Sequence, residues 1–431
     1  MDQTSDKSTY TRRDFVKATA VVAGSAVPLA AIAGSAFASG SDQLKVGLIG
    51  CGGRGTGAAF NILNASNQVR IVALADLFDD RLNGCRNNLA SENNENRDRA
   101  QVEDDRCYVG FDAFQKLIAS DVDIVILATT PHFRPMQFRA AIAANKHVFM
   151  EKPVAVDPTG IRSVIATAAE ARRKNLSVVT GTQRRHEARY LALMDRIHSG
   201  EIGEIVSARC YWNQGSLWVK EQQPTWTDME WQIRNWLYFT WASGDHIVEQ
   251  HVHNLDVCNW AIGSHPIKCF GMGGREVRTA PKYGHIFDHF AIEYEYPNGV
   301  VMQSYCRQID GCKNQVAEGI HGSIGRAWIG GGTRIIGKNA WQFTEKNPNP
   351  YVVEHKDLIA SITGKGKYLN EAKRVAESTL TAIMGRMSAY TGKELTWEAA
   401  LNSELDLSPP AYEFGSLPTT EVAVPGKTPL I

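Results

Sequence analysis

Short apolar runs alternate with amphipathic stretches along residues 44–182. The apolar runs are typical of buried strands, and they lie at 45–50, 69–75, 123–128, 147–150 and 177–181. The stretches between them have helical spacing, and they include 111–119, 134–145 and 158–175. Strands that alternate with helices predict a parallel, doubly wound sheet. Part of the polar and charged segment 79–106 is expected to be a solvated loop.

The hydrophobic period changes after residue 183. Apolar and polar residues alternate over 289–296, a Pro-Asn-Gly turn follows, and the chain returns over 300–305. Further strands are predicted at 204–212, 267–278 and 325–336. This pattern predicts a second α/β domain over 183–400, with a large open, mostly antiparallel sheet that packs one face on a core.

The last part of the chain has two different patterns. A helix predicted over 371–391 stops at Gly392, and we expect it to pack back on the first domain. Residues 401–431 are rich in proline, and they are expected to form an extended surface tail.

The run 45–49 leads into a glycine-rich turn with the spacing Gly50-x-Gly52-x-x-Gly55. Gly50 allows the tight turn, Gly52 lets a pyrophosphate approach the backbone, and Gly55 lets the helix pack near the strand. The N-terminus of the following helix offers free N–H groups to phosphates. The alternative is an ordinary strand-turn-helix.

Asp76 ends the next apolar run, 26 positions after Gly50. A carboxylate at that position accepts hydrogen bonds from a ribose 2′-OH and repels a 2′-phosphate. The sequence therefore predicts a dinucleotide site over 44–182, with NAD preferred over NADP.

Composition excludes some classes of partner. The chain has 431 residues, enough for two domains, and its 46 Lys and Arg balance its 46 Asp and Glu. Without a basic excess, nucleic acid and anionic membranes are not expected as partners. The eight cysteines show no CxxC spacing, so they predict neither a zinc ribbon nor a disulfide scaffold.

Residues 1–38 have the pattern of a twin-arginine export signal. Arg12-Arg13 precede an Ala- and Val-rich stretch, and Ala36-Phe37-Ala38 is typical of a cleavage site. The apolar stretch is too short and too rich in glycine for a stable membrane span; the alternatives are an uncleaved anchor or a disordered tail. We expect twin-arginine export to a periplasmic or external compartment with little free NAD, and therefore a tightly held cofactor.

Two groups of polar residues follow strand ends, where ligands bind in parallel sheets. Thr129, Pro131 and His132 are expected to edge the nicotinamide half of the cofactor, or only to shape a loop. Lys152 of Glu151-Lys152-Pro153 is placed to hydrogen-bond a substrate oxygen, although a surface lysine is the simpler alternative.

Arg184 and Arg185 follow the strand predicted at 177–181. They are candidates for substrate binding, but on sequence alone a solvent-facing position is slightly favoured.

Residues 244–263 carry four polar groups at helical spacing. His246, Glu249, His253 and Asp256 follow one another at intervals of three, four and three, so a continuous helix brings them to one face. Three readings stay open: a histidine general base held by a carboxylate, a buried polar network, and a metal site. The metal reading is the poorest, because HExxH is absent.

Tryptophans gather in the same region of the sequence. Seven of the ten lie between 212 and 260. Aromatic faces suit the C–H faces of sugars, which makes Trp212 a substrate-binding candidate, but a core or subunit interface explains the cluster equally well.

Together, GLIGCGGRG (47–55), EKP (151–153) and His253-Asn254-Leu255-Asp256 resemble the glucose–fructose oxidoreductase / inositol dehydrogenase (Gfo/Idh/MocA) family over roughly 44–400. The resemblance implies a Rossmann domain followed by an α/β domain whose open sheet often forms a dimer or tetramer interface. The implied cofactor-binding residues are Gly50, Gly52, Gly53, Arg54, Gly55, Asp76, Thr129, Pro131, His132, Glu151 and Lys152.

The resemblance also implies that Lys152 and His253 are catalytic. Where the family usually has Asp, four residues before the histidine, this chain has Glu249, which is expected either to orient His253 or to contact a substrate hydroxyl. Arg184, Arg185, Asp256 and Trp212 are the candidate substrate-binding residues, and no metal is expected.

The implied activity is NAD-dependent hydride transfer from a hydroxyl-bearing carbon of a sugar, glycoside or polyol. Two other functions are kept as alternatives: a redox-neutral NAD-dependent glycosidase that oxidises, eliminates, hydrates and reduces, and a sugar-binding module without catalysis. A homodimer or homotetramer through the second sheet is expected.

Overall fold

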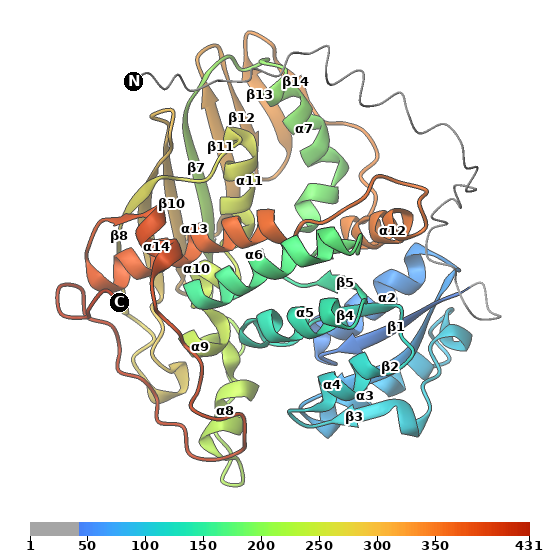
Figure 1. Cartoon of the computed structure of the whole chain (residues 1–431). Helices are drawn as coiled ribbons and strands as arrows, with labels where there is room; N and C mark the ends of the chain where they lie inside the picture. Colours follow the sequence, from blue (N-terminus) through green and yellow to red (C-terminus); the bar gives the residue numbers. More distant parts are fainter. Residues whose placement is uncertain (1–42) are drawn as a thin grey trace, which may run out of the picture. The chain divides into compact units, whose positions relative to one another are not determined.

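The computed structural model describes residues 43–431, which form one compact unit built around two β-sheets (Figure 1). The predicted export signal lies outside these described residues. Within them, no helix is both long enough and apolar enough to cross a membrane.

The first sheet has six parallel strands in the order β3-β2-β1-β4-β5-β6. Its strands are β1 (Leu44–Ile49), β2 (Val69–Asp76), β3 (Cys107–Val109), β4 (Ile124–Leu127), β5 (His147–Met150) and β6 (Val178–Thr180). The helices between them are α2 (Gly53–Ala65), α3 (Asp79–Ala90), α4 (Ala113–Ala119), α5 (Arg134–Ala143) and α6 (Pro158–Arg173). The predicted doubly wound sheet is confirmed, and strand order reverses between β1 and β4.

The second sheet has nine strands in the order β14-β13-β12-β11-β7-β10-β9-β8-β15, and only β7 and β10 pair in parallel. The strands are β7 (Ile205–Gln214), β8 (Lys268–Gly274), β9 (His289–Glu295), β10 (Val301–Gln308), β11 (Gln315–Gly322), β12 (Gly325–Ile329), β13 (Thr333–Gly337), β14 (Trp341–Gln342) and β15 (Leu395–Thr396). The predicted open, mostly antiparallel sheet is therefore confirmed.

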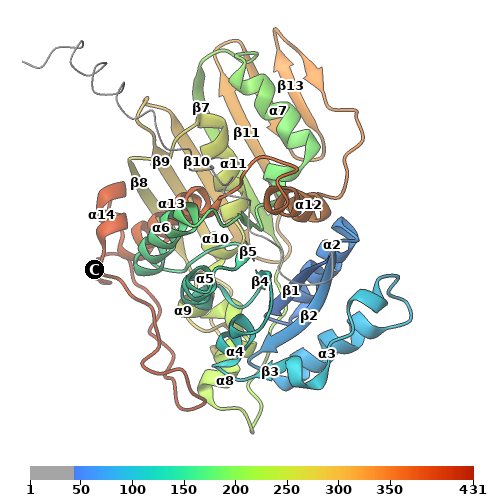
Figure 2. The ribbon, with the colours of Figure 1, turned by 45° about the vertical axis from the view of Figure 1, so that its right-hand side comes forward.

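Helices cover one face of the second sheet (Figure 2). They include α7 (Ala188–His198), α11 (Val252–Ile262) and α13 (Ala372–Thr391), with α10 (His246–Glu249), α12 (Pro350–Ile362) and α14 (Trp397–Asn402) beside them. Burial alternates along β10, where Met302, Ser304 and Cys306 are buried and Gln303 and Tyr305 face outward. The other face of the sheet is therefore open.

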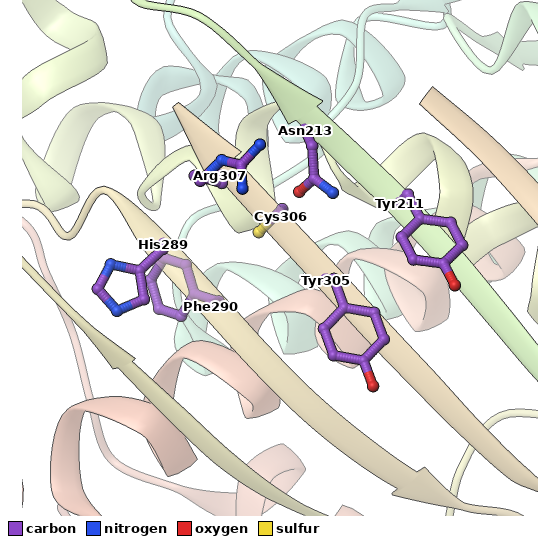
Figure 3. A pocket seen from close by; sticks show the side chains of 7 residues that line it. All are labelled: Tyr211, Asn213, His289, Phe290, Tyr305, Cys306 and Arg307. Carbon is purple, nitrogen blue, oxygen red and sulfur yellow. The ribbon is translucent and has the colours of Figure 1, made fainter. Parts of the chain in front are cut away.

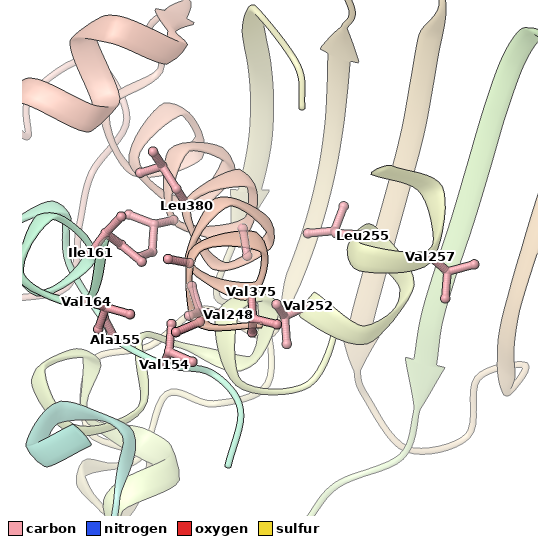
Figure 4. Close-up of a cluster of buried hydrophobic side chains, with 14 of the residues drawn as sticks. Val154, Ala155, Ile161, Val164, Val248, Val252, Leu255, Val257, Val375 and Leu380 are labelled. Atoms are coloured by element: carbon pink, nitrogen blue, oxygen red, sulfur yellow. The ribbon is translucent and has the colours of Figure 1, made fainter. Parts of the chain in front are cut away.

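A common apolar core joins the two sheets. Ile161 and Val164 of α6 lie in one buried cluster with Val375 and Leu380 of α13 and Leu255 of α11 (Figure 4). The expected packing of the 371–391 helix against the first domain is confirmed by the contact between α13 and α6.

Two predictions of continuous elements were wrong. The strand predicted at 325–336 is the hairpin β12–β13, because Gly330, Gly331 and Gly332 all take positive φ and turn the chain back. The helix predicted over 244–263 is broken into α10 and α11. His251 lies at the break, where its Nε2 is 2.7 Å from Ser304 Oγ of β10.

Most of the clustered tryptophans lie in the segment of the chain between β7 and β8 that holds α8 (Asp228–Arg234) and α9 (Thr240–Ser243). Trp231 and Trp241 are buried there in a separate apolar cluster with Phe133 and Phe239. For these two tryptophans the core explanation holds, whereas Trp212 lies on β7.

Candidate active site

The glycine turn between β1 and α2 has the shape that a pyrophosphate requires. Gly50 has φ +96°, and a Cβ on Gly55 would lie 1.7 Å from the carbonyl oxygen of Gly50. A Cβ on Gly52 or Gly53 would meet nothing within 4 Å, so space is open in front of the turn. Gly52 caps α2 without a side-chain hydrogen bond, which leaves N–H groups of the first turn free for an anion.

Asp76 ties the end of β2 to this turn. Its carboxylate accepts hydrogen bonds from Cys51 N at 2.6 Å and Phe78 N at 2.8 Å. Burial raises the pKa of Asp76. Each carboxylate oxygen has a further lone pair, so ribose hydroxyls still find acceptors. These residues fit a dinucleotide.

Arg54 links the glycine turn to the turn after β5. Its Nε donates a hydrogen bond to Glu151, and its Nη2 lies 3.7 Å from Glu354 Oε1 of α12. Glu151 fills the space above Gly181, where a Cβ would lie 2.3 Å from its Oε2. Burial raises the pKa of Glu354 well above its usual value. Sequence reasoning missed Glu354, which carries no motif.

Lys152 is not a surface lysine, so that alternative was wrong. Its Nζ donates to the backbone oxygen of Glu249 at 2.6 Å and to Glu249 Oε1 at 2.9 Å. The two side chains are 14 % and 13 % exposed. The question left open for Glu249 is answered in part: it pairs with Lys152 and makes no hydrogen bond to His253 among the described residues.

His253 lies in the first turn of α11, four residues after Glu249 in the chain, and its ring stacks on Trp212 with centroids 5.8 Å apart. Within residues 43–431 neither of its ring nitrogens makes a hydrogen bond, unlike a histidine in a satisfied core network. Burial, with the nearby charges of Lys152 and Arg184, holds the pKa of His253 well below 6.5. The imidazole is therefore neutral near pH 7 and able to accept a proton.

The other two polar residues of the 244–263 segment belong to structural networks. His246 Nδ1 lies 2.9 Å from Asp245 Oδ1. Asp256 accepts hydrogen bonds from Arg185 and from Ser378 Oγ. The expectation that four polar groups share one helical face fails because the helix breaks at His251.

The preference for solvent-facing arginines was also wrong. Arg184 pairs with the buried Glu318 and lies over the Trp212 ring at 5.8 Å. Arg185 makes two 2.8 Å hydrogen bonds to the Asp256 carboxylate. Both side chains are buried because each meets a carboxylate brought in by the second sheet or α11. Sequence reasoning missed Glu318, since it lies on β11, a strand that was not predicted.

Thr129, Pro131 and His132 follow β4 as predicted. Thr129 Oγ1 donates to Gln137 at 2.7 Å, and His132 Nε2 is hydrogen-bonded to the Tyr412 hydroxyl at 2.8 Å. His132 thus faces the C-terminal tail, and whether these three residues touch the nicotinamide half stays a prediction. Among residues 43–431, no group of three His, Cys, Asp or Glu side chains could hold a metal ion.

Comparison with known proteins identifies the family of both domains. The family model described as "Oxidoreductase family, NAD-binding Rossmann fold" matches residues 44–180, and the model "GFO/IDH/MocA C-terminal domain" matches 190–328. An inositol 2-dehydrogenase of Salmonella typhimurium is 30 % identical over 51 % of this chain and 54 % of its own length. That of Rubrobacter xylanophilus is 27 % identical over 67 % and 72 %.

The fold also matches solved structures. A levoglucosan dehydrogenase in complex with NADH and L-sorbose superposes with a TM-score of 0.66 at 16 % identity, covering 82 % of this chain and 99 % of the other. The chain spans about half the length of the first curated relatives it matches. Because the models of both domains of one family match in order, over 44–180 and 190–328, this chain belongs to the Gfo/Idh/MocA family of oxidoreductases.

Proposed function

We propose that this protein is an exported, NAD-dependent oxidoreductase that oxidises a hydroxyl of a sugar, glycoside or polyol. The observation that carries the proposal is the Lys152–Glu249 pair beside a neutral, unpartnered His253, on a fold with a dinucleotide turn. A cation and a proton acceptor side by side are what removal of hydride from a carbinol carbon needs.

In the proposed reaction, the substrate hydroxyl lies between Lys152 and His253. His253 accepts the hydroxyl proton at a ring nitrogen, and the ammonium of Lys152 stabilises the negative charge that develops on the oxygen. Glu249 holds that ammonium through two hydrogen bonds. NAD, when bound, supplies the hydride acceptor.

The cofactor is proposed to be NAD rather than NADP, and to stay bound between turnovers. Asp76 supports the choice, because its carboxylate repels a 2′-phosphate. The cofactor is proposed to be held by the turn at Gly50, Gly52 and Gly55. Arg54 pairs with Glu151 beside this turn and so offsets the negative charge of that carboxylate.

The substrate class is supported by the relatives. The two curated relatives compared above are inositol 2-dehydrogenases, and the levoglucosan dehydrogenase structure holds L-sorbose. Trp212, whose ring stacks on His253 and lies under Arg184, is proposed to line the substrate site beside them.

Export through the twin-arginine machinery is proposed from Arg12-Arg13 and the sequence that follows. That route carries folded proteins, which suits an enzyme loaded with its cofactor before it leaves the cytoplasm.

A homodimer or homotetramer through the open face of the second sheet is also proposed. Met272 is 66 % exposed there and Tyr305 is 37 % exposed. Tyr211 and Tyr305 stack at 5.6 Å beside a hollow of the same face, where Arg307 also lies (Figure 3). Exposed apolar and aromatic side chains on a broad flat surface are typical of subunit interfaces.

The test is an activity screen with purified protein. The protein is incubated with NAD and a panel of inositols, aldoses and glycosides, and NADH is followed by its near-ultraviolet absorbance. Formation of NADH with a keto product supports the proposal. Release of an aglycone without net NADH supports the redox-neutral glycosidase instead, and carbohydrate binding with neither signal supports the binding module.

A further inference from the structure

The C-terminal tail forms a loop that is fixed at its base. Among residues 403–431 there is no helix or strand. Ser403 Oγ donates a hydrogen bond to the carbonyl oxygen of Ile431, and Gly426 N donates to Thr391 O at 2.9 Å. Between these anchors the chain runs from α14 down to α8 and back (Figure 1). We call residues 405–424 the strap.

The far end of the strap is docked on α8. Met229 N donates to Gly415 O at 3.2 Å, and Gln232 Nε2 donates to Leu417 O at 2.6 Å. The Asp228 carboxylate accepts from Leu417 N at 3.1 Å. Strap and helix therefore hold each other through several hydrogen bonds.

Two aromatic residues of the strap lie on the loops that follow the parallel strands. The Tyr412 hydroxyl is hydrogen-bonded to His132, just after β4. The Phe414 ring stacks on Phe78, just after β2, at 5.9 Å, and packs against Phe111, just after β3, at 5.2 Å.

The strand order shows where the strap crosses the first sheet. Because β1 lies between β2 and β4, residues 412–414 run from one side of β1 to the other along the carboxyl edge of the sheet. Dinucleotides bind at that edge, where the strand order reverses.

Arg234 of α8 contacts Phe78, the residue on which Phe414 of the strap also stacks. Its guanidinium lies 3.8 Å from the centroid of the Phe78 ring and pairs with Asp80 at 3.0 Å. Phe78 N is hydrogen-bonded to Asp76, the residue proposed to take the ribose hydroxyls. Phe78 therefore lies between the ribose position and the two groups that clamp it, Phe414 and Arg234.

We propose that the strap and α8 are part of the dinucleotide site: they close over the adenosine half of the cofactor and must lift before it leaves. This inference rests on the proposed NAD function and deepens it, because it names what retains the cofactor. Phe414 is 46 % exposed, and a few hydrogen bonds and ring contacts hold residues 412–417. Such a segment opens locally at a small fraction of the cost of global unfolding.

The test measures cofactor dissociation from the full-length protein. Protein loaded with NADH is mixed with excess NAD, and loss of energy transfer from tryptophan to bound NADH gives the dissociation rate. Phe414→Ala and Arg234→Ala are compared with wild type. Val422→Ala is the matched control, an apolar residue of the same strap that is 37 % exposed and makes no ring contact with Phe78.

Loss of the Phe414 ring contacts is expected to raise the dissociation rate roughly tenfold, with the control unchanged. Hydrogen exchange at residues 412–417 is expected to slow when NADH binds, and the melting temperature without cofactor reports whether each variant is folded. Rates within twofold of wild type in both variants, with no change in exchange, overturn the strap proposal alone. A wild-type protein that binds no dinucleotide overturns the proposed function as well.

Discussion

Lys152 and Glu249 define the site at the scale of single residues. Each is mostly buried, and each is the other's charge partner, although 97 positions separate them in the chain. A buried charge without a partner is energetically costly, so loss of either residue would leave the other charge buried and unpaired. The pairing leaves His253 free of a carboxylate, and its ring is instead set by Trp212.

Replacing Lys152 with alanine is expected to lower kcat/KM by about 10²–10³-fold, the usual effect of removing one donor to a developing oxyanion. NADH affinity should change little, since the glycine turn is untouched. Steady-state kinetics and NADH titration check both. Lys174→Ala, which removes a partly exposed lysine paired with Glu170 at the end of α6, is the control. Near-normal turnover in Lys152→Ala would remove Lys152 from the chemistry.

The pH profile should report His253. Its folded pKa is held well below 6.5 by burial and by Lys152 and Arg184, so it is a neutral base across the neutral range. We expect kcat/KM to stay level from about pH 8 down to 6.5 and to fall at lower pH. His253→Asn should lose about 10²–10⁴-fold in rate and lose this acid limb. An acid limb that survives in the variant assigns the base elsewhere.

At the scale of elements, the docking of α12 depends on a charged histidine. His186, in the turn Gln183–His186, meets Asp357 of α12 at 2.6 Å and Glu371, the residue before α13, at 3.5 Å. Burial lowers the pKa of His186, but these two carboxylates more than offset it and raise the pKa to about 9. The protonated ring thus holds three segments together.

This linkage predicts how stability depends on pH. A folded pKa above the unfolded value of 6.5 adds stability that is fully present below pH 6.5 and is lost as pH rises through about 9. The free energy of unfolding should therefore decrease by roughly 1–3 kcal/mol across this window, reduced by the partly exposed Asp357. Urea titrations of wild type and His186→Gln check it: the difference between them should shrink with rising pH, and a constant difference would contradict the assignment.

The strands and helices also show which parts of the fold could be predicted from the sequence. The buried strands of the first sheet are mostly apolar runs, so pattern alone located β1, β2, β4, β5 and β6. The break at His251 was missed because nothing local marks it, and the contact of His251 there is with Ser304, far away in the sequence. The glycines at 330–332 carried the signal for a hairpin, but they were read as part of one strand.

The same limit applies to the site. Lys152 and His253 could be predicted as site residues because short motifs and a family resemblance mark them. Arg184 and Arg185 were misjudged, since their burial depends on Glu318 and Asp256, which only the fold brings to them. A charged residue on an unrecognised strand gives no local signal, and that is why Glu318 was missed.

At the scale of the whole molecule, the open face of the second sheet should control assembly. Met272 and Tyr305 project from different strands of that face. The double variant Met272→Glu/Tyr305→Glu places charges where another copy is proposed to pack, which costs several kcal/mol per interface. Sedimentation should show the wild type as a dimer or larger and the variant as a monomer. Val277→Glu, an exposed residue after β8 and outside the sheet, is the control. A wild-type monomer would contradict the proposed assembly.

The central claim is that Lys152 and His253 act together on a hydroxyl facing a bound dinucleotide. The most direct measurement uses a substrate from the activity screen with deuterium on its carbinol carbon, in a single turnover with NAD-loaded protein. The account predicts deuterium at C4 of the nicotinamide in wild type, and little or none in Lys152→Ala or His253→Asn loaded with the same cofactor. Product that forms in wild type while the cofactor remains unlabelled would contradict it.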